Sequence, residues 1–322
     1  MLFTSFVNAQ DIVLSQPFMS GQFLSPASVG NGLYKRRIKG NLKAQMIDGN
    51  NLYQTMVVGM DTRFKSADEN SKNYLGIGGQ IISDQVKNGL MQSNYIGLNL
   101  AYHIFIDKDL YKDIALGFGT VYAQTTLDKS KLFFGDQYDY AGGLTSNATM
   151  ENLPPYPSEF SAIAGLLYTQ HNETIFIQTG GTASFFSKPN ITYSITNSAP
   201  EYSYRFFTNM ELPFLNDYSI ALHGNMLYKK VKNQYFLGGT IGAPISSDEE
   251  NLKRIYVGCF YRYKEAVVPT ISFISNQYIF GMSYDIYNPK NNGANLRMSS
   301  IELTLSASFG GKKTNLFRTI FD

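Results

Sequence analysis

The stretch SSIELTLSASF at residues 299–309 decides the fold of this chain. Its odd positions read Ser, Ile, Leu, Leu, Ala, Phe, and its even positions read Ser, Glu, Thr, Ser, Ser. Because successive side chains of a strand point to opposite faces, one face suits lipid and the other suits water or packed polar groups. About ten residues with this alternation, ending in an aromatic residue, are typical of a strand in a transmembrane β-barrel.

The same signal recurs along the chain. Segments with alternating polarity or a β-rich run are found at residues 38–47, 54–64, 73–83, 92–106, 113–127, 159–170, 173–182, 201–212, 217–229, 233–243, 254–264, 267–274, 277–287 and 299–309. These fourteen segments form an even number, as in bacterial single-chain barrels. The sequence therefore predicts an all-β protein: one transmembrane antiparallel β-barrel of about 14 strands over residues 38–309.

Composition favours the same class. Charged residues make up 16% of the 322 residues and aromatic residues 14%, with 23 Tyr, 23 Phe and no Trp. Tyr combines an apolar ring with a polar tip, so its abundance fits the aromatic girdles at the two surfaces of a membrane. No window reaches the 18 or so consecutive apolar residues that a spanning helix requires, which excludes a helical membrane protein.

Charged residues within the strands fall on one parity. On residues 201–212, Arg205 and Glu211 oppose a face that carries Tyr202, Tyr204 and Phe206. A charge facing mid-bilayer lipid costs about 2–4 kcal/mol, so the charged parity is expected to face the lumen. The predicted lumenal polar network comprises Asp61, Arg63, Arg205, Glu211, Arg262 and Glu302. These residues either line a binding channel or form a static network of mixed sign that holds a plug.

The residues before the first strand have a different character. Val7-Asn8-Ala9 resembles the end of a cleaved secretory signal, so residues 1–9 are interpreted as a residual signal peptide. Pro17 and Pro26 exclude a membrane strand between residues 10 and 37. A fourteen-stranded barrel encloses more space than its own side chains fill, so this segment is predicted to plug the lumen, the alternative being a periplasmic arm. Residues 310–322 form a C-terminal tail.

The connections between the predicted strands alternate in length. If both chain ends lie in the periplasm, the longest connection, at residues 128–158, lies outside the cell. Aromatic residues in exposed loops often anchor protein contacts, and those of the longest connection are the candidate partner-binding residues: Phe133, Phe134, Tyr138, Tyr140 and Tyr156. The alternative is that they fold back on the barrel mouth or join the outer aromatic girdle.

Other function classes are disfavoured. A net charge of +2 gives no field that would recruit nucleic acid. By parity the single cysteine, Cys259, lies on the apolar face, and no Cys or His spacing resembles a zinc site. His103 and His223 point inward and His171 falls in a predicted turn, but no nucleophile elbow accompanies them. We therefore expect no catalytic residues, no metal, no cofactor and no enzymatic activity.

Several short motifs occur in a characteristic order. They are SQPFM (15–19), FLSPASVG (23–30), GIGGQIISD (76–84), NLAYH (99–103), LGFG (116–119) and FGMSYD (280–285). In this order and spacing the chain resembles the PorP/SprF family of type IX secretion system membrane proteins. It departs from the family pattern at Ser25, where Asn is usual, and in continuing beyond Phe309.

The resemblance implies a non-enzymatic barrel in the bacterial outer membrane that works in type IX secretion and gliding motility. It implies that the protein binds, exports or anchors a secreted adhesin through the adhesin's C-terminal sorting domain. Its other implied partners are the translocon or periplasmic ring components. The alternative function is that of a porin or a hydrophobic-substrate transport barrel with an N-terminal plug, since strand patterning reports the lipid interface and not the lumen.

Overall fold

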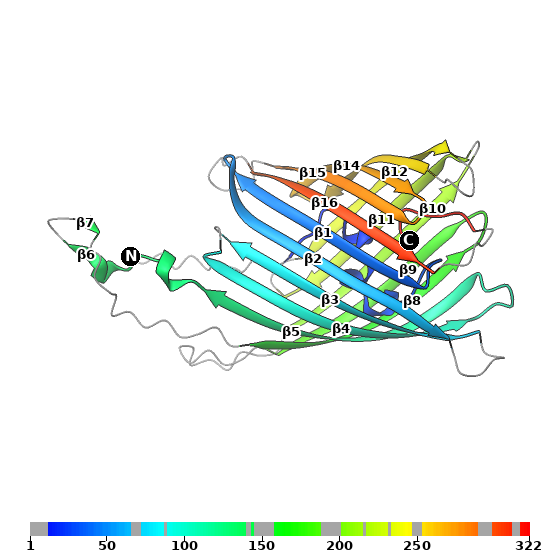
Figure 1. Ribbon diagram of the computed structural model, residues 1–322, viewed down its shortest axis with the longest axis horizontal. Helices are drawn as coiled ribbons and strands as arrows, with labels where there is room; N and C mark the ends of the chain where they lie inside the picture. The colour runs from blue at the N-terminus through cyan, green and yellow to red at the C-terminus, as the bar shows by residue number, and fades with distance from the viewer. Residues whose placement is uncertain are drawn as a thin grey trace.

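The chain forms a closed antiparallel β-barrel of fourteen strands (Figure 1). The computed structural model describes residues 12–65, 72–86, 89–139, 143–144, 158–187, 201–214, 217–230, 233–246, 253–288, 298–310 and 316–322. The barrel strands are β1 Arg36–Ile47, β2 Asn50–Lys65, β3 Tyr74–Val86, β4 Met91–Phe105, β5 Lys112–Leu127, β8 Glu159–His171, β9 Phe176–Ser187, β10 Glu201–Pro213, β11 Ser219–Lys229, β12 Gln234–Ser246, β13 Lys253–Arg262, β14 Ala266–Ser275, β15 Tyr278–Tyr287 and β16 Met298–Phe309. The predicted fold class is confirmed.

Each strand pairs with its neighbours in sequence, and the first strand pairs with the last. β1 and β16 close the barrel in a continuous register from Arg36 opposite Phe309 to Ile47 opposite Met298. Strand positions agree with the sequence prediction to within a few residues. The largest shift is in β9, which was expected at residues 173–182 and runs from Phe176 to Ser187. His171, expected in a turn, is the last residue of β8.

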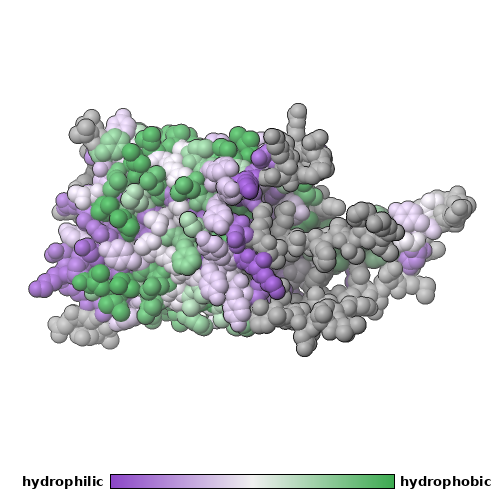
Figure 2. All heavy atoms as spheres, turned by 180° about the vertical axis from the view of Figure 1, so that it is seen from behind, coloured by the Kyte–Doolittle hydropathy of each residue, from purple (hydrophilic) through white to green (hydrophobic). Residues whose placement is uncertain are grey.

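The alternation in β16 has the predicted orientation. Leu303 and Leu305 are 50% and 47% exposed on the outer wall, whereas Glu302 is 0% exposed. Cys259 also lies exposed on the outer wall, as its parity predicted. Figure 2 shows apolar side chains gathered on the wall of the barrel, with polar side chains at its end. No helix in the described part of the chain is long and apolar enough to cross a membrane.

Two segments outside the strands enter the barrel. We call the end of the barrel where β1 begins and β16 ends the base, and the opposite end, which carries the connection at residues 128–158, the loop end. The inner segment, residues 12–34, contains η1 Pro17–Met19, α1 Gly21–Leu24 and η2 Pro26–Ser28. It is the dark blue trace inside the barrel in Figure 1. The C-terminal segment, residues 316–322, is largely buried at the base.

The longest connection carries small elements of its own. They are η3 Lys129–Lys131, η4 Gly135–Gln137, and a two-stranded sheet of β6 Tyr138–Asp139 and β7 Gly143–Leu144. These short strands were not predicted, because two-residue strands leave no alternation to detect. Figure 1 shows β6 and β7 beyond the loop end of the barrel, away from the wall. We call residues 128–139 the arm.

The fold makes a prediction about the outer wall. Leu98 and Ile104 lie on the outer face of β4, Leu98 at its middle and Ile104 near its end, and are 67% and 38% exposed. Replacing Leu98 with Arg should lower the free energy of unfolding in phospholipid vesicles by about 2–4 kcal/mol, and Ile104→Arg by about 0–1 kcal/mol. Urea titration of the vesicle-inserted barrel measures both. Equal losses at the two positions would contradict the placement of Leu98 at mid-bilayer.

Candidate functional site in the barrel lumen

The inner segment crosses the lumen from the loop end to the base. Val13 lies near the loop end, where its carbonyl oxygen accepts a hydrogen bond from Lys43 Nζ at 3.0 Å. Leu33 lies at the base, where its backbone N–H donates to Asp322 Oδ1 at 3.4 Å. Between them the chain turns three times. Pro17 and Pro26 stand at the first positions of two 3₁₀ turns, where a missing N–H costs no hydrogen bond.

Inward glycines allow the inner segment to approach the wall closely. A Cβ atom on Gly117 of β5 would lie 2.2 Å from the backbone nitrogen of Ala27. One on Gly76 of β3 would lie 2.1 Å from the carbonyl oxygen of Val29. Real Cβ atoms do not approach backbone this closely, so only glycine fits at either position. The closest approach of the inner segment is therefore at η2 and Val29, against β3 and β5.

Glu302 of β16 holds the first part of the inner segment. Its side chain is 0% exposed. It accepts hydrogen bonds from the backbone N–H groups of Ser15 at 2.5 Å and Gln16 at 3.0 Å, and from Asn41 Nδ2 at 2.9 Å. Carboxylates that accept several such bonds form strong, directional anchors. The carboxylate thus fixes the segment to the seam between β1 and β16.

A second group of charges lies beside Glu302 toward the loop end. Lys43 Nζ is 2.9 Å from Asp285 Oδ2, and Arg262 Nη2 is 3.2 Å from the same oxygen. Lys43 also donates to Ser15 Oγ at 2.8 Å. All three charged side chains are nearly fully buried. Removing one charge from such a group leaves its partners uncompensated, so these residues act as a unit.

The base half of the inner segment is held by Asp61 and two arginines. Arg37 Nε and Nη2 each lie 3.0 Å from a different oxygen of Asp61, in a bidentate pair. Arg37 also donates to the carbonyl oxygen of Ser28 at 2.9 Å. Arg63 donates to the carbonyl oxygen of Gly32 at 3.0 Å. Bidentate pairing fixes both the position and the plane of the guanidinium group.

The other two predicted network residues lie on β10. Arg205 Nη1 donates to the carbonyl oxygen of Phe23 at 2.8 Å, and its guanidinium lies 4.9 Å from the centre of the Phe23 ring. Glu211 is fully buried and accepts from Ser219 Oγ at 2.8 Å, Tyr256 OH at 2.7 Å and the backbone N–H of Ile320 at 3.0 Å. Glu211 thus contacts the C-terminal segment rather than the inner segment.

The structure places the six predicted network residues on the inner face of the wall. Asp61, Glu211, Arg262 and Glu302 are buried, and Arg63 and Arg205 are partly buried. Sequence reasoning did not include Arg37 and Lys43. These residues belong to β1 and have the same inward parity, which was the available signal. Sequence reasoning also assigned no role to residues 316–322. Four apolar residues in this segment follow the last strand: Leu316, Phe317, Ile320 and Phe321.

The inward histidines serve the packing of the lumen. His103 Nδ1 lies 2.8 Å from Asp113 Oδ2, and its Nε2 lies 2.8 Å from the carbonyl oxygen of Val29. His223 pairs with Asn209. Both histidines are at most 1% exposed. No group of three or more His, Cys, Asp or Glu side chains in the described ranges is arranged to hold a metal ion.

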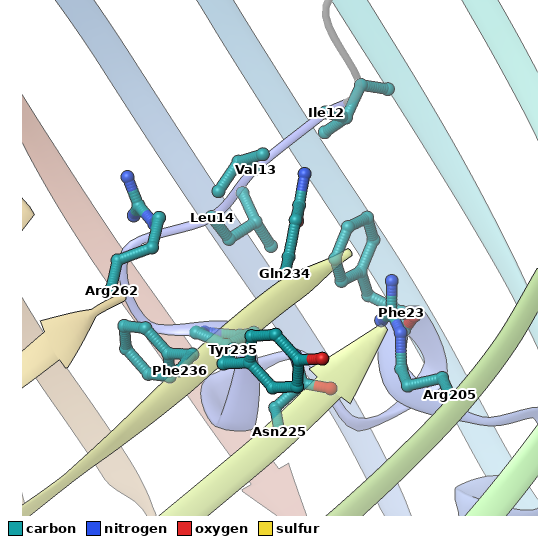
Figure 3. A pocket seen from close by; sticks show the side chains of 11 residues that line it. Ile12, Val13, Leu14, Phe23, Arg205, Asn225, Gln234, Tyr235, Phe236 and Arg262 are labelled. Atoms are coloured by element: carbon teal, nitrogen blue, oxygen red, sulfur yellow. Dashed lines mark hydrogen bonds between the residues drawn. The ribbon is translucent and has the colours of Figure 1, made fainter. Parts of the chain in front are cut away.

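A small cavity lies between the inner segment and the wall at the loop end (Figure 3). It encloses about 30 Å³, which is room for about two water molecules. Its lining comprises Ile12, Val13, Leu14, Pro17, Phe23, Arg205, Asn225, Gln234, Tyr235, Phe236 and Arg262. In Figure 3 these side chains surround the start of the inner segment.

The candidate partner-binding residues lie on the arm or outside the described residues. Phe133 and Tyr138 are 63% and 59% exposed, and Phe134 is partly buried. Tyr140 and Tyr156 fall outside the described residues. Figure 1 shows β6, which contains Tyr138, beyond the loop end of the barrel.

These features define a class of protein, the outer-membrane β-barrels. The chain belongs to the PorP/SprF family of type IX secretion system membrane proteins, whose family model matches residues 6–306. The predicted family and the predicted location in the outer membrane are thereby confirmed. A comparison with curated proteins gave no match.

The chain is similar to solved structures of transport channels. The toluene transporter TodX of Pseudomonas putida has a TM-score of 0.50 and 8% sequence identity, over 91% of this chain and 93% of that chain. The toluene transporter TbuX of Ralstonia pickettii has a TM-score of 0.48 and 8% identity, over 90% and 94%. The KdgM porin has a TM-score of 0.40 and 12% identity, over 84% and 99%. At these identities the likeness concerns the fold alone.

The bidentate pair makes a stability prediction. Asp61→Ala leaves the buried guanidinium of Arg37 without its carboxylate, so the free energy of unfolding should fall by about 3–5 kcal/mol. The double variant Arg37→Met/Asp61→Leu removes both charges and should recover most of that loss. Denaturant unfolding of the barrel in vesicles measures both variants. A double variant as unstable as Asp61→Ala would show that the lost stability does not come from the unpaired charge.

The glycine contacts make a second prediction. Gly117→Ala places a methyl group against the backbone of Ala27, which should displace η2 from the wall and expose residues 25–29 to protease. Gly40→Ala is the matched control, because its Cβ would meet no atom closer than 3.7 Å. Limited proteolysis followed by mass spectrometry locates the cuts. Identical digestion of the two variants would contradict the close approach at Gly117.

Proposed function

We propose that this protein is a non-enzymatic outer-membrane component of the type IX secretion and gliding machinery that binds, exports or anchors a partner adhesin. The partner would be recognised through its C-terminal sorting domain. The observation that carries the proposal is the family match across residues 6–306 on a barrel whose lumen holds a segment of its own chain. Translocon or periplasmic ring components are the other proposed partners, on the side of the base.

The contents of the lumen support a binding role over a conducting one. The inner segment is bonded to wall strands on several sides, through Glu302, Arg37, Arg63 and Arg205. Leaving a buried charged group without its hydrogen-bond partner costs free energy. We therefore propose that residues 12–34 act as a plug that stays in place during function. A plugged barrel then acts as a membrane anchor and a docking platform.

The arm supplies the proposed contact surface. Phe133 and Tyr138 are large and exposed. Aromatic residues contribute strongly to protein interfaces because they bury much area at a small loss of conformational entropy. In an orientation with the base of the barrel in the periplasm, the arm would face the cell exterior, where a displayed adhesin is held.

The absence of a catalytic role is part of the proposal. His103 and His223 are buried among structural partners, and neither lies within hydrogen-bond distance of a Ser, Thr or Cys nucleophile among the described contacts. A nucleophile with a positioned base is the minimum for covalent hydrolysis. The geometry thus supports a binding function.

The alternative is a transport barrel with a movable plug. It is favoured by one observation, the shared fold with solved channels. It requires the inner segment to leave its contacts with Glu302, Arg37 and Arg205 so that a path opens.

One experiment separates the two functions. The tagged protein is purified from its native outer membrane in mild detergent, and co-eluting proteins are identified by mass spectrometry. Recovery of a large surface protein with a C-terminal sorting domain supports the secretion function and names the client. A lone barrel that conducts ions steadily in planar bilayers supports the transport function instead.

The arm gives a variant test of the same proposal. Replacing Phe133 and Tyr138 together with Ser should reduce recovery of the co-purifying adhesin by at least about tenfold, because interface aromatics dominate binding energy. Glu173→Ser, in an exposed turn at the base, is the matched control and should leave recovery unchanged. Unchanged recovery with the double variant would remove the arm from the proposed interface.

A further inference from the structure

The C-terminal segment is bound at the base of the barrel like a peptide ligand. It follows Gly310, which has a positive φ of 69° and ends β16. The side chains of Ile320 and Phe321 are 1% and 7% exposed. Residues so deeply buried outside the sheet occupy a site that the barrel wall has formed around them.

The wall recognises the backbone of the segment with charged groups. Glu211 of β10 accepts from the backbone N–H of Ile320 at 3.0 Å. Lys39 of β1 donates to the carbonyl oxygen of Phe321 at 3.3 Å. His171 Nε2 of β8 lies 2.9 Å from the carbonyl oxygen of Phe317. Three backbone groups are thus held from three strands of the barrel, independently of the side chains of the segment.

The site also contains an apolar pocket for one aromatic side chain. The Phe321 ring stacks on Phe176 of β9, with centroids 5.6 Å apart and planes at 14°. It meets the edge of Phe18 of the inner segment at 5.6 Å and 75°. Ile320 and Tyr256 belong to the same buried cluster. A buried ring in an aromatic pocket is the usual anchor of a peptide in its receptor.

One residue of the segment fits its surroundings poorly. The Arg318 side chain is buried, and its Nε, Nη1 and Nη2 atoms have no hydrogen-bond partner among the described residues. Its guanidinium lies 5.1 Å from the centre of the Tyr34 ring. Burial lowers the pKa of this group. A buried donor without an acceptor weakens binding, so the charge of Arg318 is not a determinant of recognition, in contrast to the ring of Phe321.

We propose that the base of the barrel is a peptide-binding site, filled here by residues 316–322 of the same chain, that takes a peptide ending in a turn with an adjacent aliphatic and aromatic pair. Glu211, Lys39 and His171 read the peptide backbone, and Phe176 and Phe18 form the pocket for the aromatic ring. A peptide of this chemistry supplied by another protein on the side of the base would compete with the chain's own segment. The inference concerns the base alone and is independent of the adhesin role proposed above.

The test separates the C-terminal segment from the barrel after the protein has folded, so that an added peptide can bind in its place. A sequence-specific protease site replaces residues 311–315, and the purified full-length barrel is cut in detergent after folding. A fluorescein-labelled peptide of residues 314–322 is then titrated, and binding is followed by anisotropy with unlabelled peptide as competitor. Saturable, competable binding to the cut barrel, with much weaker binding to the uncut barrel, is the expected result.

Peptide and barrel variants define the specificity. The peptide with Phe321→Ala should bind at least about tenfold more weakly, whereas the peptide with Arg318→Met should bind at least as tightly as the parent. In the cut barrel, Phe176→Ala should reduce binding by a similar factor. Phe280→Ala, on the outer wall, is the matched control. Absence of binding to the cut barrel, or equal binding of the parent and Phe321→Ala peptides, would overturn the proposal.

Discussion

The structure depends on one constraint, which is that a barrel of fourteen strands cannot fill its own interior. Within a membrane, closing the sheet pairs every strand edge and satisfies the backbone. Closure leaves a wide lumen whose wall carries charges such as Asp61, Glu302 and Lys43. These charges would otherwise need water or ions. The inner segment and the C-terminal segment lie inside the barrel, and their backbone groups supply many of the hydrogen bonds that the charges require.

Contacts with the barrel wall stabilise the conformation of the inner segment. The inner segment has almost no regular structure, since its helical turns contain three or four residues each. Isolated turns of that length are unstable in water. They persist here because Glu302 and Arg37 bind their backbone from the wall and because Gly76 and Gly117 let them pack closely. The wall therefore determines the conformation of the segment.

The sequence predicted the wall much better than its contents. Alternation at residues 299–309 gave both the position of β16 and the direction in which Glu302 points, because lipid selects strongly against charge on the outer face. The partners of Glu302 were not predictable, since Ser15 and Gln16 contact it through backbone groups that any residue carries. The role of residues 316–322 was missed for the same reason. Aperiodic segments leave no pattern, and contacts between residues some 287 positions apart leave no local signal.

The pairing of β1 with β16 has a consequence for the order of assembly. The inner segment is bonded to strands all around the barrel, including the two that form the closing seam. Lys43 of β1 and Glu302 of β16 each contact the inner segment beside the seam. The contact of Ser15 with Glu302 joins residues 287 positions apart, so the inner segment gains its full set of wall contacts only when β16 is in place. Long-range contacts of this kind make folding slow.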